Sequence, residues 1–178
     1  MSQFVFSDQL VTITGLFAFV CLATWPLFRS RHQILLAQLG AGLAFAAHYA
    51  LMGLFAPSLL NIIGSAQTFA AIFATQSRSF NRFGYGLIPV IVAGGIYFWN
   101  GPTSALCIAA MALIALGRVQ ANEWAMRILI LVGGIFWSLH DFFVESWIAL
   151  GADVLSLATG ATMLARLAMQ KQRHSVMA

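Results

Sequence analysis

Long apolar segments fill almost the whole chain, and the breaks between them are only a few residues long. A helix that crosses a bilayer needs ~20 predominantly apolar residues, so seven of them would use about 140 residues. The chain has 178 residues, which leaves no room for a separate globular catalytic domain. The pattern therefore predicts an all-α membrane protein with seven transmembrane helices. The expected spans are 9–28, 33–54, 57–76, 83–99, 102–117, 124–144 and 147–168.

The positions of the basic residues predict the orientation of these spans. All 9 Lys and Arg residues fall in or beside the first, third and fifth loops or in the C-terminal tail. The positive-inside rule places these segments in the cytoplasm, with the N-terminus outside and the C-terminus inside. Six spans are the alternative, if the stretch 84–95 with its Gly and Pro residues fails to cross, but that count breaks the alternation of charge. Because topology explains the basic residues, no nucleic-acid partner is expected.

Scarce polar residues recur at a fixed offset along the chain. After a shift of 92 residues, His48 aligns with His140 and Asn61 with Asp153, without a gap. This shift passes over four expected spans, an even number, so both copies point the same way across the membrane. Parallel repeats of this kind are a known transporter plan. We therefore predict a 3+1+3 architecture with two parallel triple-helix repeats, in which 1–79 is the first bundle, 80–100 a linker transmembrane helix, and 101–178 the second bundle with a short cytoplasmic tail.

The repeated polar residues are the candidate binding residues. At a rise of 1.5 Å per residue, all four are expected roughly 6–8 Å below the outer surface. Ionisable groups within a span usually face the bundle interior or a water-filled cavity. We expect Asn61, Asp153, His48 and His140 to contact substrate there, together with Trp137, and Asp153 and His140 to form a proton relay. The alternative is that these side chains only join helices by hydrogen bonds.

Several other residues are expected to have ordinary roles. Asp141 and Glu145 lie closer to the outer boundary, where water can solvate them, and they make the second half more acidic than the first. That asymmetry favours a cationic ligand. Trp25 is expected to anchor a span end at the interface, and Arg127 to pair with Glu123 four residues earlier.

Two short segments resemble a known family. The stretch HYALMG (48–53), followed by Asn61, and the stretch WSLHDF (137–142) resemble the two helix hairpins of the YgjV-type bacterial inner-membrane protein family. That family's layout is similar to SWEET, PQ-loop and PnuC-type carriers. The resemblance implies a multi-pass protein of the bacterial inner membrane. In SWEET proteins an Asn of each bundle contacts substrate, and the matching positions are Asn61 and Asp153.

These observations predict a small-molecule transporter that works by SWEET-like alternating access, with a small polar or cationic solute bound between the bundles. The partners expected are the lipid bilayer and that solute, and a homo-oligomer is left open. A non-transporting membrane subunit is one alternative. A bis-histidine haem protein built on His48 and His140, or a metal site built on these two residues and Asp153, is another. The sequence has no GxSxG, HExxH or P-loop motif, so no enzyme activity, cofactor or metal is expected.

Overall fold

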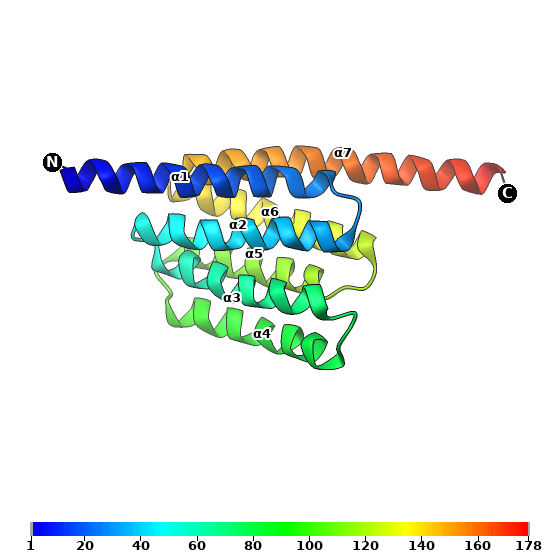
Figure 1. The fold of residues 1–178 in the computed structure, drawn as a ribbon, viewed down its shortest axis with the longest axis horizontal. Coiled ribbons are helices and arrows are strands. Elements are labelled where there is room, and N and C mark those ends of the chain that lie inside the picture. Colours follow the sequence, from blue (N-terminus) through cyan, green and yellow to red (C-terminus); the bar gives the residue numbers. More distant parts are fainter. Residues whose placement is uncertain (1, 178) are drawn as a thin grey trace.

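The structure is a computed structural model that describes the backbone of residues 2–177 and the side chains of residues 9–169, and the described chain is helical from end to end (Figure 1). The prediction of an all-α chain with seven helices is confirmed over the described residues. A single 3-10 turn, η1, follows the first helix. The elements are α1 (Ser2–Thr24), η1 (Trp25–Leu27), α2 (Arg31–Leu51), α3 (Phe55–Phe73), α4 (Arg78–Tyr97), α5 (Pro102–Arg118), α6 (Glu123–Phe143) and α7 (Trp147–Met177).

The helix boundaries follow local capping signals that lie close to the expected span edges. The Ser30 side chain caps α2 by accepting a hydrogen bond from the backbone N–H of Gln33. The Asn122 side chain caps α6 in the same way, accepting from two backbone N–H groups. Pro102 begins α5 directly after Gly101, whose φ of 96° belongs to the left-handed region that favours glycine. Both α1 and α7 extend past the apolar segments, because a helix does not have to end where its sequence becomes polar.

Five described helices are long and apolar enough to cross a membrane, namely α1, α2, α3, α6 and α7. A sixth, α5, is apolar but only 17 residues long. The remaining helix, α4, carries Arg78 and Arg82 in its first turns and is not among the helices that are long and apolar enough to cross.

Six helices form a closed ring, with the seventh outside it. Each helix of the ring packs against the next in the order α1, α2, α3, α5, α6, α7, and α7 packs against α1 again. In Figure 1 the helices α1, α2 and α3 form the front layer, and α7, α6 and α5 lie behind them. Helix α4 packs against α3 and α5 at the lower edge. The ring therefore consists of two three-helix layers that face one another.

Closest helix packing occurs between α5 and α6. A Cβ atom added to Gly133 would lie 2.8 Å from the backbone oxygen of Ala110, and one added to Gly117 would lie 3.0 Å from the backbone oxygen of Met126. Small residues allow helix backbones to approach in this way, as in many membrane helix pairs.

The outside of the ring is apolar and the inside holds buried polar groups. Large apolar side chains on the outer faces are strongly exposed, among them Phe17, Leu43, Phe69 and Ile135. Conversely, Gln67, Thr68 and Asp141 are at most 1% exposed. This distribution fits a protein whose outer solvent is lipid.

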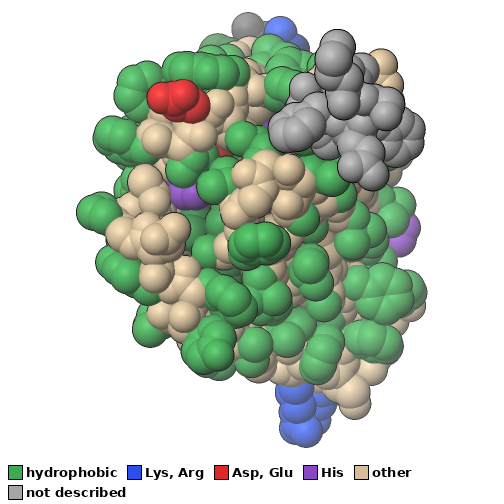
Figure 2. Space-filling view, turned by 90° about the vertical axis from the view of Figure 1, so that its left-hand side faces the viewer, with side chains coloured by type: hydrophobic (Ala, Val, Ile, Leu, Met, Phe, Trp, Pro, Cys, Tyr) green, Lys and Arg blue, Asp and Glu red, His purple; other side chains and the backbone are tan. Residues whose placement is uncertain are grey.

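The two ends of the ring differ in charge. We call the end with the α1–α2, α3–α4 and α5–α6 connections the basic end, because Arg29, Arg78 and Arg118 lie there. Arg127 also lies at this end and pairs with Glu123 at 2.6 Å, which confirms the predicted i,i+4 pair. Figure 2 shows the opposite end, where the surface is mainly apolar or neutral and Lys and Arg appear only at the margins.

Candidate functional site

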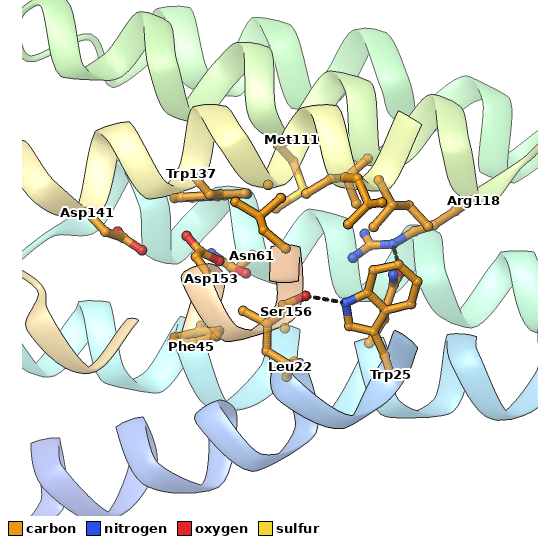
Figure 3. Close-up of a pocket in the computed structure, with 18 of the residues that line it drawn as sticks. Leu22, Trp25, Phe45, Asn61, Met111, Arg118, Trp137, Asp141, Asp153 and Ser156 are labelled. Atoms are coloured by element: carbon orange, nitrogen blue, oxygen red, sulfur yellow. Dashed lines mark hydrogen bonds between the residues drawn. The ribbon is translucent and has the colours of Figure 1, made fainter. Parts of the chain in front are cut away.

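Side chains from all six ring helices, together with Trp25 of η1, line one central cavity of about 60 Å³. One water needs about 10–15 Å³ of space for the centre of a water-sized sphere, so the cavity has room for about four to six waters. Its polar groups gather at two ends (Figure 3). Asp141, Asp153 and Asn61 lie toward the opposite end of the bundle, whereas Arg118 and Trp25 lie toward the basic end.

Asp141 is the centre of a buried hydrogen-bonded cluster. The hydroxyl of Tyr49 donates to its Oδ1 at 2.6 Å, and Nδ1 of His140 donates to the same oxygen at 3.0 Å. Asp141 is only 1% exposed, so the expectation that water solvates it is wrong. Hydrogen bonds to a carboxylate are among the stronger ones, and they offset part of the cost of burying this charge.

Asp153, by contrast, is incompletely paired. The side chain is 6% exposed, and its Oδ2 is buried without a hydrogen-bond partner. Its electrostatic neighbour is the carboxyl group of Asp141. A buried polar atom without a partner is uncommon in native structures and often marks a functional group. The nearby Asn61 donates its side-chain N–H to the backbone oxygen of Pro57 in its own helix at 2.9 Å.

Three aromatic rings form a wall beside these carboxyl groups. Phe45 stacks on Tyr49 with ring centroids 5.8 Å apart, and Tyr49 stacks on Trp137 at 5.9 Å with the two planes only 12° apart. The stack joins α2 of one layer to α6 of the other. An aromatic face beside carboxylates is a good environment for a cation.

At the basic end, the cavity is lined by a guanidinium and an indole. Nε of Arg118 donates to the side-chain oxygen of Gln38 at 2.8 Å, and Nη1 donates to the backbone oxygen of Gly64 at 3.2 Å. Nε1 of Trp25 donates to Oγ of Ser156 at 2.8 Å. Trp25 is 1% exposed, so it is a buried cavity residue and the expectation of an interfacial anchor is wrong.

Among the residues predicted to bind substrate, Asn61, Asp153 and Trp137 line the central cavity. His140 lies next to it, through its bond to Asp141, and lines a separate pocket of about 210 Å³ at the end opposite the basic end. His48 is not among the residues that line either of these two pockets.

Both nitrogens of the His48 ring contact other groups. Its Nδ1 donates to the backbone oxygen of Val11 at 2.9 Å, and its Nε2 lies 3.3 Å from Oγ of Ser146. The ring also packs so closely on Gly15 that a Cβ added there would lie 2.9 Å from it. His48 therefore joins α1 and the α6–α7 connection to α2.

The structure offers little support for a haem or metal site. The ring of Tyr49 contacts both imidazoles, with centroids 5.6 Å from His48 and 6.1 Å from His140, so an aromatic side chain packs against both candidate ligands. Within the described residues, no group of three or more His, Cys, Asp or Glu side chains is placed to hold a metal ion.

Sequence reasoning missed Arg118, Tyr49 and Trp25 as cavity residues. One signal for Tyr49 was present, because Tyr49 and Asp141 directly follow the two repeated histidines and are themselves 92 residues apart. The cavity contains further pairs at this offset: Leu22 and Ile114, Gln38 and Ile130, Gly42 and Gly134, Phe45 and Trp137, and Asn61 and Asp153.

Comparison with known proteins identifies the family to which the sequence is related. Residues 9–171 match the model of the Imp-YgjV family, described as a bacterial inner membrane protein. Neither the search of curated proteins nor the search of solved structures found a match.

Proposed function

The chain belongs to the Imp-YgjV family of bacterial inner membrane proteins, and from this premise we propose that it transports a small solute that carries a cationic group. The observation that carries the proposal is the unpaired Oδ2 of Asp153 beside Asp141 in a cavity between the two helix layers. An acid buried within a membrane-spanning region is costly, and such residues commonly mark substrate or ion pathways. Trp137 adds an aromatic face on which a cation can rest.

The arrangement of the helices supports an internal repeat as the basis of transport. In such a repeat, α1 corresponds to α5 and α3 corresponds to α7. The packing of α1 against α7 then corresponds to the packing of α5 against α3, so the same helix contact occurs twice. The hydrogen bond between Tyr49 and Asp141 then joins equivalent positions of the two copies, which places it near their twofold axis. In transporters built from parallel repeats, substrate binds at the interface between the copies.

We infer that transport occurs by movement of one layer against the other. The cavity, at about 60 Å³, is small beside the ~300–1,000 Å³ of typical ligand pockets. A conformation of this kind can enclose a small solute, and separation of the two layers at one end would open it to one side of the membrane. For this transport movement we infer a topology with seven membrane spans, in which the N-terminus is outside and the basic end is cytoplasmic.

Proton coupling fits the contacts beside the cavity. His140 lines the pocket at the end opposite the basic end, which is the outer pocket in the proposed orientation, and it donates to Asp141. Asp141 is in turn the electrostatic neighbour of Asp153 in the cavity. These three side chains form a continuous path from the outer pocket to the proposed solute. We propose that a proton follows this path as the solute is exchanged.

Uptake into proteoliposomes tests the proposed function. We expect the purified protein to take up radiolabelled ethanolamine or choline above the level of protein-free liposomes. Asp153→Asn should reduce this uptake at least tenfold, because it removes the charge but keeps the shape. Glu145→Gln is the matched control, since Glu145 is an exposed acid outside the cavity.

Two results would contradict the proposal. No uptake of either cation, or of glycine as a further solute with an ammonium group, by well-folded protein would favour the alternative of a non-transporting membrane subunit. Equal uptake by wild type and Asp153→Asn would remove Asp153 from the site.

A further inference from the structure

Arg118 is a buried cation without a counter-ion. Its side chain is at the end of α5, is 6% exposed and lines the central cavity. The ion pairs among the described side chains are Arg127 with Glu123 and His140 with Asp141, so Arg118 has no carboxylate within 4.0 Å. Its two acceptors, Gln38 and the backbone oxygen of Gly64, are both neutral.

The donors of Arg118 are only partly used. A guanidinium has five N–H donors, and the two hydrogen bonds to Gln38 and Gly64 occupy two of them. A buried charge that lacks an ionic partner is expensive, and a bound anion is the kind of group that offsets this cost. Guanidinium groups bind carboxylates especially well because their planar fork matches the two oxygens.

Other arginines at the basic end behave differently. Arg31 donates to the backbone oxygens of Ala71 and Arg118, which lie in the last turns of α3 and α5. Arg127 donates to Glu123 and to the backbone oxygens of Pro26, in η1, and Phe28, directly after it. These two side chains hold helix ends together, and Arg127 also pairs with an acid. Arg118, by contrast, lies against the cavity.

We propose that the transported solute is a small zwitterion, whose anionic group binds Arg118 and whose cationic group binds Asp153 and Asp141. This inference rests on the proposed function and adds the second half of the substrate. Figure 3 shows the guanidinium of Arg118 and the two carboxyl groups at opposite ends of the same cavity. The small cavity volume restricts the solute to a compact molecule, such as a short amino acid or a compact betaine.

Matched pairs of probes separate the two charges of the solute. Glycine and ethanolamine share an ammonium group and differ in whether a carboxylate or a hydroxyl is at the other end. Glycine betaine and choline form a second pair of the same kind. Binding to the purified protein is followed by the fluorescence of Trp25 and Trp137, which line the cavity, and uptake is measured in proteoliposomes.

We expect wild-type protein to bind at least one zwitterion about ten- to hundredfold more tightly than its matched cation, because a charge-assisted hydrogen-bonded pair is gained. Arg118→Gln should remove this preference, because the matched zwitterion and cation then meet no guanidinium in the cavity. Arg166→Gln is the control for loss of an exposed arginine outside the cavity.

A second variant, Gln38→Glu, tests the role of Arg118 independently in case Arg118→Gln does not fold. Gln38→Glu keeps the size of the side chain and places a carboxylate against Nε of Arg118, 2.8 Å away in the wild type. It should neutralise the guanidinium in place and also remove the preference for the zwitterion.

The possible outcomes distinguish this inference from the proposed function. Equal binding of zwitterion and matched cation by wild type overturns the zwitterion and leaves a cation transporter. A preference for the zwitterion that survives in both Arg118→Gln and Gln38→Glu overturns the role of Arg118. No binding or uptake of any of the four probes overturns both.

Discussion

Replacing Tyr49 with Phe tests the contact that joins the two helix layers. The hydroxyl of Tyr49 on α2 donates to Oδ1 of Asp141 on α6 at 2.6 Å, in a region where both side chains are at most 2% exposed. The substitution removes one oxygen and keeps the ring, so the stacking on Phe45 and Trp137 should persist. The change therefore isolates one hydrogen bond.

The expected cost follows from the surroundings of Asp141. A hydrogen bond to a charged group contributes ~1.5–3 kcal/mol in soluble proteins, whereas side-chain bonds in membrane helices average ~0.6 with a maximum of ~1.7 kcal/mol. Asp141 keeps one donor, His140, after the substitution. We therefore expect Tyr49→Phe to lower the free energy of unfolding by about 1–2 kcal/mol, a range set by these two scales.

The measurement is unfolding in SDS followed by tryptophan fluorescence, with Tyr97→Phe as the matched control. Tyr97 is 83% exposed, so loss of its hydroxyl should leave stability unchanged. The double variant with Asp141→Asn completes a cycle that gives the coupling energy of the pair. Equal stability of Tyr49→Phe and wild type, with no coupling to Asp141, would show that this contact does not join the layers.

Three further predictions concern packing, orientation and the two histidines. Gly133→Ala should destabilise the fold by about 1–3 kcal/mol, because the added Cβ would meet the backbone oxygen of Ala110. Gly86→Ala is the control and should not destabilise the fold, because a Cβ added there meets open space. Thermal unfolding of the two variants measures the difference. A fluorescent protein fused to the C-terminus should fold and fluoresce in the cytoplasm, and alkaline phosphatase fused there should be inactive; the reverse pattern would refute the orientation. His48→Ala should lower thermal stability and leave solute affinity unchanged, whereas His140→Ala should slow uptake.

The helices could be predicted because their signal is local and strong. Apolar segments, Ser30 and Asn122 as caps, and Pro102 as a first helical residue all depend on neighbouring residues in the sequence. Asn61 and Asp153 could also be predicted to line a cavity, since polar groups in apolar helices seldom face lipid. These inferences need no knowledge of which helices are neighbours.

Arg118, Asp141 and Trp25 could not be assigned correctly, because each lies near a span end. At such a position a charged or aromatic side chain can reach the interface or turn into the protein, and both directions are compatible with the sequence. The direction depends on partners from distant helices. Trp25 bonds Ser156, 131 residues away, and Arg118 bonds Gln38, 80 residues away.

Access to Ser156 from the two sides of the membrane tests alternating access most directly. Ser156 lines the cavity, is 6% exposed, and can be replaced by Cys with little change in shape once Cys21 and Cys107 have been removed. An impermeant thiol reagent should label the Ser156→Cys variant in right-side-out and in inside-out membrane vesicles, and saturating glycine should slow both reactions. A thiol that reacts from one side only, or from neither, would contradict a cavity that opens to each side in turn.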